Sequence, residues 1–270
     1  MTISRNTPGA AGLEVRDLTV SYGAEPVLEN LSFALPAGAS LAIVGESGCG
    51  KSTLLTTLAG LLEKSSGDVR WSDADGAPIS HLNSSFVWQN LGLFPWKSVL
   101  ENLELPLKLK NAATEAKERS ERAEEMLDEL GLSALRNRSP AQLSGGQRQR
   151  LAIGRALIAH PDVLFMDEPF SALDALRRER LQDFLAGMRK RRPVTMIFVT
   201  HDIPEAAFLA SHILLLAANP PRVLELYENP SWVPKRASAD RESPEYLEAI
   251  RHVHGLLRSA SVPENQGAAS

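Results

Sequence analysis

Cysteine and long apolar runs are nearly absent from this sequence, and each absence limits where the chain can act. Cys49 is the only cysteine among 270 residues, so no internal disulfide can form and we expect a reducing compartment. The longest clean apolar run, Ile213 to Ala218, is far shorter than the ~20 residues that span a bilayer. Residues 1–12 contain no apolar core of signal-peptide length. We expect a chain that is soluble by itself and reaches a membrane only through a partner.

An excess of positive charge is absent as well. The chain has 29 Lys and Arg residues against 33 Asp and Glu residues, which gives a net charge of -4. Proteins that bind DNA or RNA usually present a surplus of basic side chains to the phosphates. We therefore expect no nucleic acid among the partners.

Hydrophobic residues, by contrast, make up 43% of the chain and follow strand and helix patterns. Apolar and polar residues alternate over Leu13–Tyr22, while Ser40–Gly45 is a short apolar run that leads into glycines. Both patterns predict strands, and the segment after Lys51 has helical periodicity. Strands that alternate with helices predict an α/β fold with a mostly parallel sheet.

Between Gln89 and His160 the pattern becomes that of charged, amphipathic helices. One apolar stripe precedes Gly131, a residue that commonly ends a helix. The stripe consists of Ala116, Ala123, Met126, Leu127 and Leu130. We therefore divide the chain into a flexible N-terminus (1–12), a main domain (13–222) with a helical insertion at about 93–158, and a tail (223–270). The tail is expected to contain one short helix with Ser243 as its N-cap.

The stretch GESGCGKS, Gly45 to Ser52, matches the phosphate-binding pattern G-x-x-x-x-G-K-[ST] between a strand and a helix. Glycines let successive backbone N–H groups face phosphate oxygens, and the helix N-terminus adds partial positive charge. Lys51 is expected to reach the β- and γ-phosphates, and the Ser52 hydroxyl to ligate Mg²⁺. The predicted nucleotide-binding residues here are Gly45, Glu46, Ser47, Gly48, Cys49, Gly50, Lys51, Ser52 and Thr53. The place of Cys49 at a helix N-terminus could lower the pKa of its thiol.

Two adjacent carboxylates follow the apolar run VLFM. Asp167 is expected at the carboxyl end of a buried strand, where ligands bind in open α/β sheets. A carboxylate in that place suits Mg²⁺, which prefers oxygen ligands. Glu168 is next to it and could polarise an attacking water. Together with the phosphate loop, the pair predicts hydrolysis of a nucleotide.

A second anion-binding device appears at LSGGQRQR, Leu143 to Arg150, far along the chain from the first. Ser144, Gly145 and Gly146 lie at the start of a predicted helix, whose free N–H groups could face a phosphate. A flexible turn is the alternative reading of the three residues taken alone.

The order of these motifs resembles that of the ATP-binding cassette (ABC) family over roughly Leu13 to Arg222. In that resemblance Ser144, Gly145, Gly146 and Gln147 match the signature, and Tyr22 matches the aromatic residue that stacks on adenine. Gln89 matches the Q-loop glutamine, and the resemblance implies that it is a Mg²⁺ ligand and, like His201, a catalytic residue. Ser171–Asp174 matches the D-loop, with Asp174 near nucleotide, and His201 matches the switch histidine. The resemblance implies an ABC-type P-loop NTPase core with an inserted helical subdomain and a small antiparallel β subdomain. It also implies that two copies pair head to tail, so that each signature contacts ATP held by the other copy.

The apolar loop NLGLFPW after Gln89 has two readings. It could be a plug inside the helical insertion, or a groove wall that receives a helix of a membrane subunit. Its GLFPW portion resembles the nitrate, sulfonate and taurine importers. That resemblance implies transmembrane permease subunits, a separate solute-binding protein, and a peripheral location on the cytoplasmic face of the inner membrane.

Other classes of ABC protein compete with this assignment. Soluble ABC ATPases of DNA repair or translation usually carry long coiled-coil or zinc insertions, or two fused cassettes. Here the spacing from Lys51 to Ser144 is short and the cassette is single. An inactive regulatory cassette is disfavoured because every catalytic position is intact. An exporter or lipid-transport ATPase stays an alternative.

Overall fold

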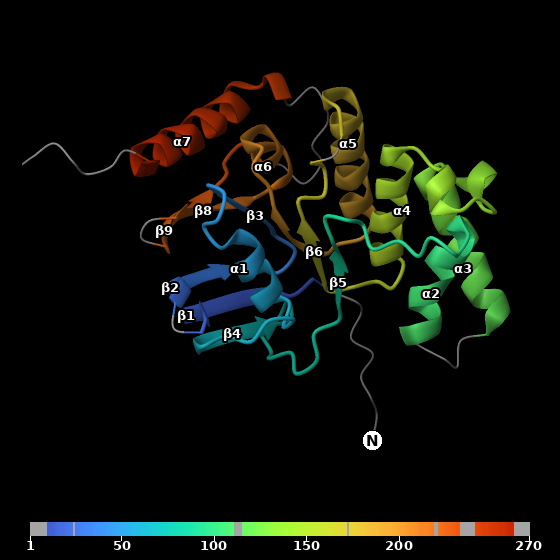
Figure 1. The fold of residues 1–270 in the computed structure, drawn as a ribbon, viewed down its shortest axis with the longest axis horizontal. Helices are drawn as coiled ribbons and strands as arrows, with labels where there is room; N and C mark the ends of the chain where they lie inside the picture. Colours follow the sequence, from blue (N-terminus) through green and yellow to red (C-terminus); the bar gives the residue numbers. More distant parts are fainter. Residues whose placement is uncertain are drawn as a thin grey trace, which may run out of the picture.

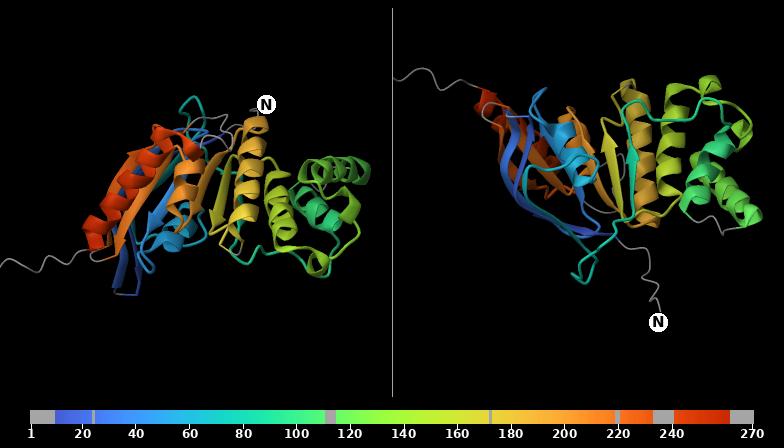
Figure 2. Two further views of the ribbon diagram at one scale, coloured as in Figure 1. Left: turned by 90° about the horizontal axis from the view of Figure 1, so that it is seen from above. Right: turned by 60° about the horizontal axis from the view of Figure 1, so that its bottom comes forward.

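The computed structural model describes residues 10–23, 25–110, 115–171, 173–218, 221–232 and 241–261. Two sheets form one end of the molecule and its middle, and a group of helices forms the other end (Figures 1 and 2). The larger sheet has the order β5-β6-β7-β3-β8-β9, in which β9 alone is antiparallel to its neighbour. Its strands are β3 (Ser40–Gly45), β5 (Ser84–Val87), β6 (Val163–Asp167), β7 (Thr195–Val199), β8 (His212–Ala218) and β9 (Pro221–Glu228).

The smaller sheet is antiparallel, with the order β2-β1-β4. It consists of β1 (Gly12–Tyr22), β2 (Glu25–Leu35) and β4 (Ser66–Ser72). Apolar residues on one face of β1 and β2 are buried, and they pack with the first helix, α1 (Lys51–Leu58), and one face of the larger sheet. This arrangement confirms the predicted α/β core with a small antiparallel β subdomain.

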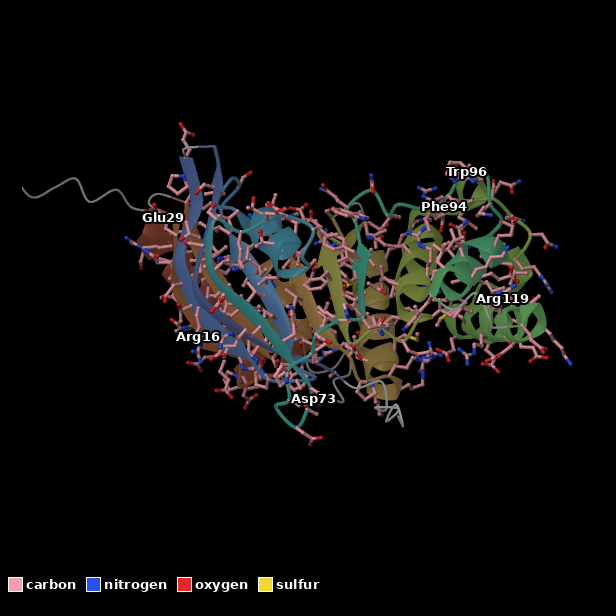
Figure 3. The ribbon with its side chains drawn as sticks, turned by 90° about the horizontal axis from the view of Figure 1, so that it is seen from below. Arg16, Glu29, Asp73, Phe94, Trp96 and Arg119 are labelled. Carbon is pink, nitrogen blue, oxygen red and sulfur yellow. The ribbon has the colours of Figure 1, made fainter. Side chains whose placement is uncertain are left out.

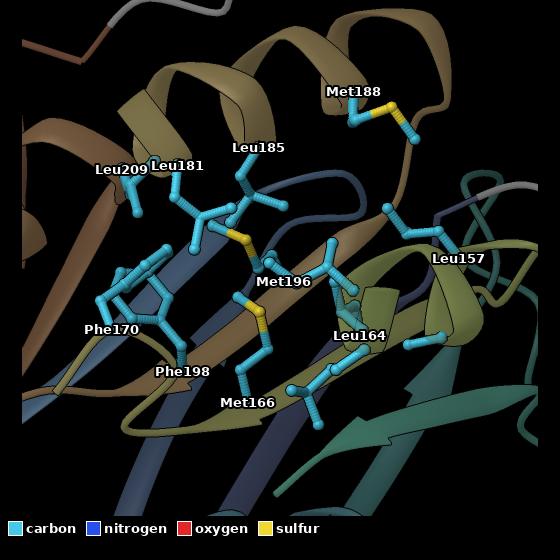
Figure 4. Close-up of a cluster of buried hydrophobic side chains, with 14 of the residues drawn as sticks. Leu157, Leu164, Met166, Phe170, Leu181, Leu185, Met188, Met196, Phe198 and Leu209 are labelled. Carbon is cyan, nitrogen blue, oxygen red and sulfur yellow. The ribbon is translucent and has the colours of Figure 1, made fainter. Parts of the chain in front are cut away.

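Strand β3 shows why the larger sheet needs cover on both faces. Its residues alternate between two cores: Leu41 and Ile43 join the core on the α1 side, while Ala42 and Val44 join the core on the other side. The second core includes Phe170 and the apolar residues of β6 and β7 under α5 (Ala175–Arg191) (Figure 4). A strand buried on both faces must be apolar throughout, which is the pattern of Ser40–Gly45.

The helical group contains α2 (Val99–Lys110), α3 (Ala116–Leu130) and α4 (Gly145–Leu157), joined by the short turns η1 (Ser133–Leu135) and η2 (Pro140–Gln142). These elements fall within the predicted helical insertion. Gly131 ends α3 with a φ of 66°, as its sequence position indicates. Four residues of the predicted stripe on α3 are buried, but Ala116 in the first turn is exposed.

The C-terminal region is more closely joined to the core than the sequence indicates. The predicted boundary after Arg222 falls inside β9, the edge strand of the larger sheet. Helix α7 (Pro244–Ser261) packs on β8 and on α6 (Ile203–Leu209), and it spans 18 residues, longer than the short helix expected. Ser243 caps it as predicted, since its Oγ accepts a hydrogen bond from Tyr246 N at 3.2 Å.

The N-terminal residues 1–9 lie outside the described part of the chain. Within the predicted flexible segment, Ala10 and Ala11 are buried, and Gly12 begins β1. Across the described ranges, no helix combines the length and apolar character needed to cross a membrane.

Candidate functional site

The phosphate loop connects β3 to α1, as the motif requires. Gly48 and Gly50 have φ values of 82° and 90°, which favour glycine strongly over other residues. A Cβ on Gly50 would also lie 2.8 Å from Leu28 Cδ2 in the neighbouring sheet. The tight turn and the packing behind it therefore both require glycine at position 50.

Lys51 carries a positive charge into this loop and is only 9% exposed. Its Nζ donates hydrogen bonds to Gly45 O at 2.9 Å and to Glu46 O at 2.7 Å. Both partners are neutral carbonyls, and no carboxylate of the described residues forms an ion pair with the ammonium. A buried ammonium with no carboxylate in direct contact favours an anionic ligand. The loop therefore has the charge that a triphosphate needs.

Ser52 and Asp167 meet beside the loop. Ser52 Oγ donates a hydrogen bond to Asp167 Oδ1 at 3.0 Å, although the two residues are far apart in the chain. Burial raises the pKa of the Asp167 carboxyl above its usual range, and the hydrogen bond from Ser52 opposes that shift. A nearby cation would favour the charged carboxylate. A hydroxyl and a carboxylate oxygen side by side fit Mg²⁺, which typically takes one or two carboxylates together with substrate phosphates.

Glu168 is the point at which three segments converge. Its φ of 44° is unusual for a residue with a side chain, and its N donates to Val199 O at 3.1 Å, which fixes the turn after β6. Gln89 Nε2 donates to Glu168 Oε2 at 3.1 Å, and His201 Nδ1 lies 3.6 Å from Glu168 Oε1. The structure thus brings the three predicted catalytic side chains together at the carboxyl ends of β5, β6 and β7.

The environment of Cys49 corrects one expectation. The residue is 2% exposed, and burial raises the pKa of its thiol. The Lys51 ammonium, with its Nζ 4.0 Å from Sγ, opposes that shift but is the smaller influence. The hypothesis of a lowered pKa is therefore wrong, because desolvation outweighs the positive end of the helix. Cys49 packs as a small apolar residue under the loop.

The Ser144–Gly146 turn, the second predicted anion-binding segment, forms the capped N-terminus of α4. Ser144 Oγ accepts a hydrogen bond from Gln147 N at 3.3 Å, while Ser144 N donates to Gln147 Oε1 at 2.9 Å. Gly145 and Gly146 form the first turn of α4, and a Cβ added to Gly146 would meet nothing within 4 Å. The backbone of this turn is therefore open to a ligand or a second chain.

The two devices lie apart within one chain. Helix α1 packs on β1, β3, β6 and β7, whereas α4 packs on β5, α2, α3 and α5. Figures 1 and 2 show α1 and α4 on opposite sides of β5 and β6. No hydrogen bond recorded for the described residues joins the Ser144 turn to the phosphate loop.

The remaining predicted residues take varied positions. Tyr22 is the last residue of β1, and its stacking on adenine stays a prediction. Thr53 lies in the first turn of α1. Asp174 caps α5 by accepting from Arg177 N at 3.0 Å, and Ala172 of the predicted D-loop lies outside the described residues.

Sequence reasoning missed two residues that shape the loop after Gln89. Asn102 is fully buried; its Oδ1 accepts from Phe94 N at 3.0 Å, and its Nδ2 donates to the carbonyls of Phe94, Lys97 and Ser98. Arg155 donates to Gly92 O at 2.7 Å and to Leu91 O at 3.1 Å. The sequence signal that could have found Asn102 is a lone Asn on the apolar side of α2.

A phosphate loop before a helix, joined to an acidic pair at the end of a neighbouring parallel strand, defines the class of P-loop ATPases. The profile described as ABC transporter matches residues 28–171, over half of the chain. The chain belongs to the ABC transporter family.

Two named relatives are import subunits. The chain is 41% identical over 217 residues to the taurine import ATP-binding protein of Escherichia coli O157:H7, covering 79% of this chain and 82% of the relative. It is 42% identical over 214 residues to an aliphatic sulfonates import ATP-binding protein of Rhizobium johnstonii, covering 79% and 76%.

Solved structures agree with the fold. The dimeric bacterial ABC transporter cassette MJ0796 has a TM-score of 0.68 and 31% identity, covering 83% of this chain and 99% of that chain. The same cassette in a post-hydrolysis state bound to ADP and Pi has a TM-score of 0.67 and 30% identity, with the same coverage.

The first prediction concerns Glu168. Glu168→Gln should keep ATP binding but lose about 10²- to 10⁴-fold in hydrolysis, because an amide cannot accept the proton of the attacking water. Steady-state ATPase assays and equilibrium nucleotide binding measure the two effects separately. Glu179→Gln, which neutralises an exposed carboxylate on α5, is the matched control. Turnover of Glu168→Gln within about threefold of wild type would assign the base to another group.

The second prediction concerns Cys49. At neutral pH N-ethylmaleimide should alkylate the folded protein more slowly than the urea-unfolded protein, because the Cys49 thiol is buried and its raised pKa leaves less thiolate. Once attached, the added bulk should block ATP binding, and bound ATP should slow the reaction further. Cys49→Ala should bind ATP normally. Alkylation of the folded protein at the rate of the unfolded chain would contradict the buried position.

Proposed function

We propose that this protein is the ATP-hydrolysing subunit of an importer for taurine, a related sulfonate or a similar small solute such as nitrate. The observation that carries the proposal is the convergence of Gln89, Glu168 and His201 beside the Ser52–Asp167 pair. One carboxylate there is held by a side-chain amide and faces an imidazole, next to a loop with a buried cation. This set of groups suits in-line attack of water on a terminal phosphate.

Each residue has a defined part in hydrolysis. The phosphate loop and Lys51 bind and orient the triphosphate, while Glu168 accepts a proton from the attacking water. Gln89 orients the Glu168 carboxylate, and His201, whose Nδ1 lies 3.6 Å from that carboxylate, would hydrogen-bond the terminal phosphate. Ser52, Asp167 and Gln89 would hold Mg²⁺, and the ion when bound would neutralise charge on the phosphates.

We further propose that two copies of the chain pair head to tail. The open Ser144 turn and the phosphate loop lie on separate parts of one chain, so a second copy is needed to bring them together. Ser144, Gly145 and Gly146 would then bind the terminal phosphate at the partner's loop. The dimeric state of the similar MJ0796 cassette supports the proposal.

The loop after Gln89 is the proposed contact with permease subunits. Trp96 is 76% exposed, and its ring packs edge-on against Phe94 with centroids 5.5 Å apart. Figure 3 places both at an edge of the helical group, remote from Arg16 and Glu29 of the small sheet. Asn102 and Arg155 hold the loop backbone, so the exposed ring belongs to a rigid surface. This exposure disfavours the reading of the whole loop as a plug, although Leu91 and Leu93 do pack on the core.

Transport then follows from coupling the contact between the two copies to the contact with the permease. ATP binding would draw two copies together, and the loop that carries Trp96 would transmit the motion to the permease. The names of the two relatives favour a sulfonate cargo, which a separate solute-binding protein would deliver. The protein would lie at the cytoplasmic face of the inner membrane.

The third prediction tests action between copies. Lys51→Ala and Ser144→Arg chains, both with Glu168→Gln to slow turnover, should each fail to occlude ATP alone. A mixture should occlude about one nucleotide per dimer, because one of its two sites combines an intact loop with an intact signature. Filter retention of labelled ATP after gel filtration measures occlusion. Normal occlusion by the Ser144→Arg protein alone would show that Ser144 does not contact nucleotide.

The fourth prediction tests the permease surface. Trp96→Ala should stay folded and bind ATP, yet assemble poorly with its membrane subunits, since a buried aromatic anchor contributes about 2 kcal/mol or more. Co-purification of co-expressed subunits measures assembly. Leu61→Ala removes another exposed apolar side chain, 58% exposed beyond α1, and should assemble normally. Loss of folding in Trp96→Ala would support the plug reading instead.

A further inference from the structure

Arg178, in the first turn of α5, connects two loops of the hydrolysis site. Its Nη2 donates a hydrogen bond to Leu173 O at 3.2 Å, and its Nη1 forms an ion pair with Asp202 Oδ2. Leu173 directly precedes Asp174 in the loop that follows Glu168, and Asp202 directly follows His201. A single guanidinium thus joins the loop that follows Glu168 to the loop that carries His201.

Asp202 is itself held in one position by the backbone around it. Its Oδ1 accepts from Glu205 N at 3.0 Å and caps α6, while its own N donates to Thr200 Oγ1 at 3.0 Å. His201 therefore lies between two residues whose side chains are fixed. Any displacement of Asp202 relative to α6 would move the His201 backbone as well.

Glu205 is a buried neighbour of Arg178 and Asp202. It is 3% exposed, and its Oε1 is buried without a hydrogen-bond partner. Burial first, and then the charge of Asp202, raise the pKa of the Glu205 carboxyl well above its usual range; Glu168 adds to the shift, while Thr200 and Arg178 oppose it. This favours an uncharged acid, which does not compete with Asp202 for the guanidinium.

The space among these groups is nearly filled. A cavity of about 10 Å³ lies between Glu168, His201, Arg178 and Glu205, and this is barely room for one water molecule. Arg178 Nε is buried there without a hydrogen-bond partner. Close packing leaves the guanidinium little freedom to move without shifting both loops.

We propose that Arg178 is a positioning residue that couples the loop of Leu173 and Asp174 to the loop of His201, so that the two loops move together and keep His201 aligned with Glu168. The proposal rests on the proposed function for its catalytic consequence. It assigns Arg178 no contact with nucleotide. Its effect runs through Leu173 on one side and Asp202 on the other.

The experiment compares Arg178→Met and Asp202→Asn with the wild-type full-length protein. Met keeps the length of the side chain but not its charge, and Asn keeps the helix cap but loses the ion pair. Arg180→Met is the matched control, because Arg180 is exposed on the same helix. Arg178→Lys is a second variant that keeps the charge but cannot bond both loops in the same fixed geometry. The measurements are ATP affinity, kcat, thermal melting, and hydrogen exchange of residues 171–174 and 200–204.

We expect Arg178→Met and Asp202→Asn to bind ATP within about threefold of wild type and to lose about tenfold or more in kcat, because misplacement of catalytic groups lowers the rate of chemistry. Hydrogen exchange should rise in both segments together, and the double variant should lose no more than either single one. Arg178→Lys should show the same pattern to a smaller degree, which covers the case that Arg178→Met does not fold. Arg180→Met should behave as wild type.

Two results would overturn the proposal. One is unchanged exchange and kcat in the folded Arg178 variants; the other is faster exchange in one segment only, which would mean that Arg178 does not couple the two. If the wild-type protein shows no ATPase activity, the proposed function fails, yet the exchange measurement still decides whether the loops are coupled.

Discussion

The buried ammonium of Lys51 is the constraint on which the rest of the site depends. It is held by two backbone carbonyls and lies where the chain turns from β3 into α1. Such a charge is costly to bury unless an anion compensates it. The tight glycine turn, the N-terminus of α1 and the packing of Gly50 against Leu28 all keep that cation at the edge of the sheet. A loop with this charge has little use except to bind phosphate.

Parallel pairing of the central strands then brings the other groups to the same edge. In the register of the sheet, Val199 of β7 lies opposite Ile43 of β3 and Asp167 of β6. The strands therefore end together, and the residues that follow them, Glu168 and His201, meet although they are distant in sequence. Ligand sites at the carboxyl ends of parallel strands have this origin. The same topology leaves Ser144 at the start of α4, away from the phosphate loop, so a single chain does not bring these two turns together.

Local patterns predicted many of the elements and singled out the phosphate loop and the Asp167–Glu168 pair. Ser40–Gly45 is a strand with the expected bounds, Gly131 ends α3, and Ser144 and Ser243 cap their helices, because each of these features depends on neighbouring residues alone. Glu168 was singled out by its place after Asp167, whereas Gln89 and His201 entered the candidate site only through the family resemblance. No periodicity in the sequence places three distant residues together.

Features that depend on distant packing could not be predicted. The burial of Cys49 depends on the sheets around the loop, and the place of β9 depends on pairing with β8. The four hydrogen bonds of Asn102 depend on how the 94–98 loop folds back over α2. Each is a long-range interaction that a local pattern does not contain.

The central claim is that the two devices act on one ATP across two copies of the chain. Sedimentation velocity of the Glu168→Gln protein, with and without Mg·ATP, tests this most directly when combined with the amount of nucleotide bound. The account predicts monomers without nucleotide, and dimers that retain one ATP per chain when Mg·ATP is present. Full ATP binding with no change in mass, at protein concentrations well above the nucleotide dissociation constant, would contradict it.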